Sequence, residues 1–186
     1  TITEGQTLMF NVFASDPDST YPNLAVHNLP LNASFIDSSR GIGYFTFTPS
    51  FTQSGDYQLA FVAFDSQDPL LADSQQIVIH VLNYNRRPVF LPAGPFTVNE
   101  GEILNFNVVA ADPDGQTPRL VTVRLPRNTT FIDNHNGIGN VNFAPDFNQA
   151  GLDSIMISAI DSLDPNLSST IYVRVNIIDV NRPPVL

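Results

Sequence analysis

The sequence lacks cysteine, tryptophan and lysine, and these absences narrow the class of protein. Without cysteine there is no disulfide framework, zinc–thiolate centre or thiol nucleophile. The eight basic residues are all arginines and are scattered, whereas Asp and Glu number 18, so the formal net charge is −10. A nucleic-acid-binding surface needs a basic stripe, and we therefore expect no nucleic-acid partner.

Long apolar runs are also missing. A membrane-spanning helix needs about 18 or more consecutive apolar residues, so we expect no membrane insertion by this stretch. The first residues are not a charged segment followed by an apolar one, so we expect no targeting segment here. The 42% hydrophobic content, with 14 phenylalanines, predicts a folded core.

An internal repeat with a period of 96 residues divides the chain. Placing residues 1–90 on residues 97–186 without a gap gives 37 identical pairs. The repeat predicts two modules, residues 1–86 and 87–186, each of ordinary domain size. The closing residues 181–186 repeat the linker at 85–90, so we expect the second module to end in a linker to a further module.

Both modules are predicted to be all-β. Apolar residues alternate with outward residues over 8–14, 57–63 and 77–81, and shorter strands are expected at 24–29 and 44–47, each with a counterpart 96 residues later. Turn signals such as Asp-Pro-Asp, Leu-Pro and Gly-Ile-Gly separate these segments. About seven short strands per module predict two tandem immunoglobulin-like β-sandwich domains.

Acidic residues occupy matching places in both modules. Each module has a glutamate before its first long strand, an Asp-x-Asp turn after it, and an aspartate after the long alternating strand. Consecutive antiparallel strands should bring the aspartates to one end of the sandwich, whereas the glutamate lies at the opposite end. In order along the chain these residues are Glu4, Asp16, Asp18, Asp65, Glu100, Asp112, Asp114 and Asp161.

Carboxylate and amide oxygens in this arrangement are the ligands that Ca²⁺ prefers, at six to eight per ion. We expect three groups of metal ligands. They are Glu4, Asn83, Asn85, Asp112, Asp114 and Asp161 at the junction, Asp16, Asp18 and Asp65 at the far end of module 1, and Glu100, Asp179 and Asn181 at the exit linker.

Several of these motifs resemble those of cadherin and cadherin-like repeats. They are Ala-x-Asp-Pro-Asp, Ala-x-Asp and the exit sequence Asp179-x-Asn181-Arg182-Pro183-Pro184. Others are closer to bacterial immunoglobulin-like and dystroglycan-type cadherin-like modules: Val98-Asn99-Glu100-Gly101, Asp112-Pro113-Asp114-Gly115 and the segment 143–151. The resemblance implies an extracellular tandem array on a cell-surface or secreted protein, sometimes with Ca²⁺ between modules.

The sequence departs from the cadherin pattern in two places. The acidic Leu-Asp-Arg-Glu segment of cadherins is replaced by Phe51-Thr52-Gln53-Ser54-Gly55. The first linker has asparagine in place of aspartate and carries Arg86 and Arg87. Both changes remove negative charge, so we expect one ion at the junction or none.

Simpler interpretations of the same residues also apply. Asp-Pro-Asp is a common turn, in which aspartate accepts a backbone hydrogen bond two residues on. The glycines of Gly-Ile-Gly are expected to provide turns with positive φ. None of His27, His80 and His135 repeats, and no Gly-x-Ser-x-Gly elbow occurs, so we expect no enzyme.

The leading hypothesis is a non-catalytic spacer or adhesion segment of an extracellular or cell-surface protein, stiffened by Ca²⁺ at the junction. Its partners would be neighbouring modules of the same chain and a cell-surface protein or polysaccharide. The alternative is an accessory module that binds carbohydrate or protein. That alternative would use exposed aromatic side chains, for which the candidates are Tyr21, Tyr44, Tyr84 and Tyr172.

Overall fold

The computed structural model of the chain describes residues 1–184, which form two compact units. Unit 1 is Thr1–Tyr84 and unit 2 begins at Asn85, two residues before the start of the module expected from the repeat. Val185 and Leu186, the last residues of that module and of its repeated linker motif, lie outside the described residues. No helix within residues 1–184 is long and apolar enough to cross a membrane.

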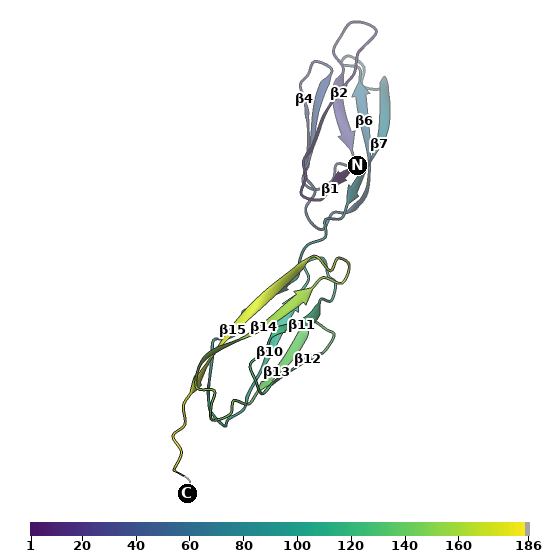
Figure 1. Cartoon of the computed structure of the whole chain (residues 1–186). Helices are drawn as coiled ribbons and strands as arrows, with labels where there is room; N and C mark the ends of the chain where they lie inside the picture. The colour runs from purple at the N-terminus through teal and green to yellow at the C-terminus, as the bar shows by residue number, and fades with distance from the viewer. Residues whose placement is uncertain (185–186) are drawn as a thin grey trace. The chain divides into compact units, whose positions relative to one another are not determined.

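Unit 1 is a sandwich of two sheets (Figure 1). One sheet has the order β1-β7-β6-β3 and the other the order β2-β5-β4. Figure 1 shows β2 and β4 on one side of the unit and β6 and β7 on the other. The strands are β1 (Ile2–Thr3), β2 (Leu8–Phe13), β3 (Asn23–His27), β4 (Ala33–Asp37), β5 (Ile42–Phe47), β6 (Gly55–Phe64) and β7 (Ala72–Leu82).

Unit 2 repeats this architecture, with sheets of order β12-β13-β10-β8 and β11-β14-β15-β9. In unit 1, β1 pairs in parallel with the last strand, β7, and in unit 2, β9 pairs in parallel with the last strand, β15. Every other ladder among the described residues is antiparallel. The strands are β8 (Val89–Phe90), β9 (Phe96–Asn99), β10 (Leu104–Ala111), β11 (Arg119–Arg124), β12 (Thr129–Asp133), β13 (Ile138–Phe143), β14 (Gly151–Ile160) and β15 (Ser168–Ile178).

The predicted alternation of the strands is confirmed. Phe10 packs against the core of unit 1, whereas its neighbour Met9 is 69% exposed, as period-two burial requires. The outward Asn105 and Asn107 of β10 are exposed and accept hydrogen bonds from the side chains of Asn142 and Asn140 across the ladder. The all-β, immunoglobulin-like fold class is therefore confirmed. The strands that the sequence pattern did not define are β1, β4, β8, β9 and β12.

The two cores have the same layout but different chemistry. In unit 1, Phe10 stacks on Phe45 with ring centroids 4.7 Å apart, and Phe61 meets both rings edge-on. In unit 2 the positions of Phe45 and Phe61 are held by Val141 and Ile157, both buried. Apolar residues from both sheets contribute in each case, so one continuous core joins the two layers.

The expected turn role of the Gly-Ile-Gly motif is confirmed at its first glycine. Gly41 and Gly137 have φ of 67° and 80°, a region that disfavours residues with a Cβ. A Cβ at Gly137 would lie 2.5 Å from the carbonyl oxygen of Ala110. Glycine at this position therefore allows close contact between the turn before β13 and the end of β10, next to the Asp-x-Asp segment that follows β10.

Candidate metal centre

The Asp-x-Asp turn of unit 2 lies beside the loop that follows β14. Within the turn, Oδ1 of Asp112 accepts the N–H of Asp114 at 2.8 Å. In the neighbouring loop, Oδ1 of Asp161 accepts the N–H groups of Leu163 and Asp164, both at 2.7 Å. These local bonds give both carboxylates a fixed orientation, which is the turn role that the sequence allowed for.

The second oxygen of each of these carboxylates has no partner among the described residues. Asp112 is 8% exposed and Asp161 is 2% exposed, so both Oδ2 atoms are withdrawn from water. The Oδ1 atom of Asn85 is likewise buried and without a hydrogen bond in the described part of the chain. Three buried oxygens without donors are a costly arrangement unless a cation neutralises and binds them.

The three side chains interact with one another, and these interactions shift the pKa of both carboxyls. Burial, with the neighbouring Asp161 carboxylate, raises the pKa of Asp112. Burial also opposes ionisation of Asp161, but hydrogen bonds from the Asp164 backbone and the Asn85 side chain outweigh it and lower the pKa of that carboxyl. The Asp161 carboxylate thus disfavours ionisation of Asp112, and a divalent cation beside both groups would favour it.

The second aspartate of the turn, Asp114, is bound by an arginine of the linker. Oδ1 of Asp114 accepts hydrogen bonds from Nε and Nη2 of Arg86, at 2.8 and 2.6 Å, and Oδ2 accepts the backbone N–H of Arg86 at 2.6 Å. Nη2 also donates to the carbonyl of Pro113 at 2.8 Å. The Asp114 side chain is 4% exposed, so this is a largely desolvated, charge-assisted contact.

The corresponding aspartates of unit 1 approach one another more closely. One oxygen each from Asp16, Asp18 and Asp65 lies within 4.8 Å of the other two, and within residues 1–184 this is the one such group of three acidic or histidine side chains. Backbone hydrogen bonds from Asp68 and Gln67 lower the pKa of Asp65, and a side-chain hydrogen bond with Asp16 lowers it further. Burial acts in the opposite direction but is outweighed. These three residues are the predicted site at the far end of module 1, and they remain candidate ligands.

The predicted glutamates lie at the other end of each sandwich. Glu4 is 2% exposed and accepts the N–H groups of Gln53, Ser54 and Tyr84, at 2.8, 2.7 and 3.1 Å. Glu100 makes the matching bonds in unit 2, to Gln149, Ala150 and Val180. Each glutamate thus joins the loop before the penultimate strand to the segment that leaves the last strand.

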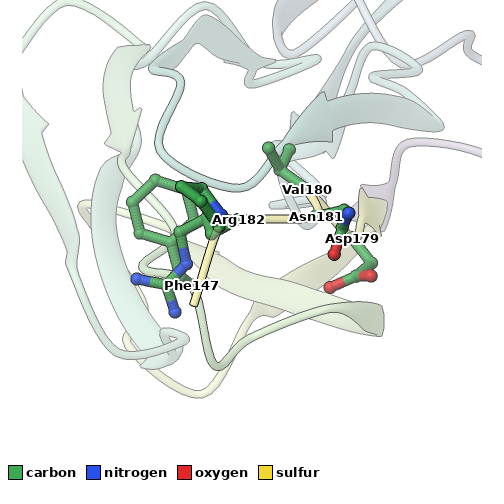
Figure 2. Close-up of a pocket in the computed structure, with 6 residues that line it drawn as sticks. Phe147, Asp179, Val180, Asn181 and Arg182 are labelled. Carbon is green, nitrogen blue, oxygen red and sulfur yellow. The ribbon is translucent and has the colours of Figure 1, made fainter. Parts of the chain in front are cut away.

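The exit of unit 2 holds the remaining predicted ligands (Figure 2). Burial opposes ionisation of Glu100, but the backbone donors of Val180, Gln149 and Ala150, with the Asp179 side chain, lower its pKa. Figure 2 shows Asp179 and Asn181 on the segment that carries Arg182 over the ring of Phe147. The guanidinium carbon of Arg182 is 4.2 Å from the ring centroid, a cation–π distance.

The structure therefore brings together some predicted ligands and adds a contact that sequence reasoning missed. Asn85, Asp112 and Asp161 lie together in unit 2 as candidate ligands, whereas Glu4 and the exposed Asn83 belong to unit 1. Asp114 binds Arg86, although Arg86 had been interpreted only as a loss of negative charge. The available signal was its position, directly after Asn85 in a linker that repeats as Asn181-Arg182.

The candidates for other functions are distributed over the surface. Tyr21, Tyr44, Tyr84 and Tyr172 are 64%, 47%, 52% and 65% exposed. Of the histidines, His80 pairs with Asp56 at 2.7 Å on the outward face of β7.

Comparisons with known proteins agree with this architecture. Residues 85–176 match the family model described as "Bacterial Ig domain". The chain is 24% identical over 143 residues to human Protocadherin gamma-A3, covering 69% of this chain and 15% of that protein. It is 28% identical over 155 residues to the Fat-like cadherin-related tumor suppressor homolog of Drosophila melanogaster, covering 78% of this chain and 3% of that protein.

Solved structures show the same fold. The extracellular cadherin domains 3–6 of Protocadherin Gamma B2 match 97% of this chain and 45% of that chain, with a TM-score of 0.65 at 18% identity. The Protocadherin GammaB4 extracellular domain matches 96% of this chain and 30% of that chain, with a TM-score of 0.61 at 20% identity. The chain thus spans less than half the length of these relatives.

The fold, the repeat and these similarities define a class. The chain is a tandem pair of cadherin-like, immunoglobulin-like β-sandwich modules, as its motifs indicated.

Proposed function

We propose that this chain is a non-catalytic spacer or adhesion segment of a larger cell-surface or secreted protein, and that Ca²⁺ bound at Asn85, Asp112 and Asp161 stiffens its linker. Its partners would be neighbouring modules of its own chain and a cell-surface protein or polysaccharide. The observation that carries the metal proposal is the set of three buried oxygens without donors.

The donor set suits calcium. Two carboxylates and an amide supply hard oxygens, and water or backbone carbonyls would complete the six to eight ligands that Ca²⁺ takes. Bound Ca²⁺ would cancel the repulsion between Asp112 and Asp161. It would also hold Asn85, the first residue of unit 2, against the loop that follows β14. The linker would then be tied to unit 2 instead of moving independently.

The proposal is tested by calorimetric titration of the full chain with CaCl₂, together with thermal unfolding in Ca²⁺ and in EDTA. We expect at least one ion to bind, and millimolar Ca²⁺ to raise the melting temperature. Replacing Asp112 and Asp161 together by asparagine should abolish binding at this site and the stabilisation of unit 2. Unfolding that is identical in Ca²⁺ and EDTA, with no heat of binding, would contradict the proposal.

Matched variants separate this site from its counterpart in unit 1. The pair Asp16→Asn and Asp65→Asn changes the same residue types by the same charge, and should leave the Ca²⁺ response of unit 2 intact. The exposed Asp73, which accepts only its neighbour's N–H in the described structure, provides a control for charge alone. Loss of the response in the Asp73→Asn variant would indicate a nonspecific charge effect.

A further inference from the structure

We propose that Arg86 acts as a built-in cation of unit 2: it binds Asp114 in place of a metal ion and limits the neighbouring site to one divalent cation, held by Asp112, Asp161 and Asn85. This inference rests on the proposed calcium site and specifies how that site is regulated. The contact between the linker arginine and the Asp-x-Asp turn carries it.

The geometry of Arg86 satisfies Asp114 completely. Both oxygens of the carboxylate accept at least one hydrogen bond from Arg86, from the guanidinium on one side and the backbone N–H on the other. Nη2 donates in addition to the carbonyl of Pro113, within the same turn. These are the oxygens that an Asp-x-Asp turn would otherwise offer to a metal ion.

The carboxylates of Asp112 and Asp161, unlike that of Asp114, are only partly satisfied by hydrogen bonds. Each uses Oδ1 for backbone N–H groups and keeps a buried Oδ2 without a partner in the described structure. The three aspartates of unit 2 therefore divide into one that is neutralised by the chain itself and two that still lack a cation. An ion at the latter pair needs no ligand from Asp114.

Unit 1 provides the internal comparison. There the same three positions, Asp16, Asp18 and Asp65, lie within 4.8 Å of one another, and no ion pair within residues 1–184 joins them to an arginine. In unit 2, where Arg86 binds the middle aspartate, the trio does not gather to this distance. The turn sequence Asp-Pro-Asp is the same in both units, and the arginine contact distinguishes unit 2.

The contact between Arg86 and Asp114 also bears on how many calcium ions the site binds. A site that has lost one carboxylate to an arginine carries two negative charges, which match a single divalent ion. With three carboxylates available, a second ion or tighter binding would be favoured, because the number of ligand charges tunes calcium affinity. Arg86 is thus a residue that determines the number of ions without touching them.

The experiment is calcium titration calorimetry of full-length variants that all carry Asp16→Asn and Asp65→Asn, so that the trio of unit 1 does not contribute. In this background we compare the parent with Arg86→Gln. We expect Arg86→Gln to release Asp114 and to give either a second bound ion or an affinity about tenfold higher. Arg87→Gln is the matched control, since it removes the same charge from the next, exposed residue, and it should leave the affinity within about twofold.

A second set of variants, based on Asp114→Asn, tests whether Asp114 itself is a calcium ligand. With Arg86 present, Asp114→Asn should change the calcium affinity by less than about threefold, whereas Asp112→Asn should abolish binding. In the Arg86→Gln background, Asp114→Asn should reverse the gain. Circular dichroism of each variant checks that the sandwiches remain folded.

The outcomes separate the two proposals. If the parent binds calcium and Arg86→Gln binds it identically, the role of Arg86 is wrong and the calcium site stands. If Asp114→Asn weakens binding as much as Asp112→Asn, Asp114 is a ligand and the role of Arg86 is again wrong. If the parent binds no ion but Arg86→Gln does, the calcium function is wrong and the substitution of a cation by Arg86 is supported. If neither the parent nor Arg86→Gln binds calcium, both the calcium site and the role of Arg86 are wrong.

Discussion

The carboxylate of Glu4 accepts the backbone N–H of Tyr84, 80 residues later in the chain, at 3.1 Å. Glu100 and Val180 repeat this contact in unit 2 at 3.3 Å. Each glutamate closes its sandwich by tying the end of the last strand to the loop that precedes the strand beside it. Each glutamate, expected to bind metal, thus already uses three of the about four lone-pair sites of its carboxylate for backbone N–H groups.

Glu4→Gln should destabilise unit 1 by about 2 kcal/mol, because the amide would turn a donor toward the N–H of Tyr84 and leave it unpaired in a buried place. Hydrogen–deuterium exchange measured along β6 and β7 would report the loss in unit 1 alone. The exposed Asp73→Asn removes the same charge from the same unit and should leave exchange unchanged. Equal exchange in the two variants would show that the buried bonds contribute little.

Asp112→Asn should stabilise unit 2 at pH 7 in EDTA, raising its melting temperature by about a few degrees. The pKa of Asp112 is raised by burial and by Asp161, so the folded unit favours the protonated carboxyl. Such a group stabilises the fold at low pH and loses that contribution as pH rises through its folded pKa. Asparagine avoids this loss and still offers Oδ1 to the N–H of Asp114.

The advantage of Asp112→Asn should shrink as pH falls toward about 4, where an ordinary aspartate takes up its proton. In millimolar Ca²⁺ the order should reverse, because the native carboxylate gains an ion that asparagine holds poorly. Thermal unfolding of both chains across pH, with and without Ca²⁺, measures this. A variant that is less stable than the native chain at pH 7 in EDTA would contradict the expected repulsion.

Gly137→Ala should cost unit 2 about 3 kcal/mol or more, since it adds a Cβ at positive φ and presses it against a backbone oxygen. The Cβ would lie 2.5 Å from the carbonyl oxygen of Ala110. Gly115→Ala is the matched control, because Gly115 also has positive φ but nothing within 4 Å of the added atom. Gly115→Ala should lower the free energy of unfolding by only about 1 kcal/mol. If urea unfolding gives similar losses for the two variants, the backbone has shifted to relieve the contact with Ala110.

Phe143→Ala should destabilise unit 2 by about 3–5 kcal/mol through the cavity that it leaves. Phe143 is 0% exposed and belongs to the core that joins both sheets of this unit. Leu152→Ala, at a side chain that is 85% exposed, should change stability by less than about 0.5 kcal/mol. Because the units have separate cores, exchange in the core of unit 1 should be the same in both variants.

Much of the fold was predictable because its signals are local. Period-two burial placed Phe10 inward and Met9 outward, and the structure agrees. The shorter β4 was missed because its exposed Ile36 breaks the polar outward pattern that marks a half-buried strand. Asp37, at the end of β4, accepts the N–H of Ser39 in a local turn, and its other oxygen accepts the N–H of Leu24 at 3.0 Å.

The candidate site was predictable in part. The repeat identified Asp112 and Asp161 as residues at one end of unit 2, because strand direction follows from the order of strands. It did not reveal that both are nearly fully buried, or that Asn85 lies against Asp161. Nor did it pair Arg86 with Asp114, since a contact across 28 residues has no local signature.

By itself the sequence determined the number of modules, their all-β class and the residue types at their ends, because repeats and period-two patterns follow from the chain alone. Only the tertiary structure decided which oxygens are satisfied. Glu4 and Glu100 accept hydrogen bonds from backbone N–H groups, Asp114 accepts them from an arginine, and Asp112 and Asp161 each keep one buried oxygen without a hydrogen-bond partner in the described structure. The physical reason is that hydrogen bonding and burial depend on neighbours brought in by the fold.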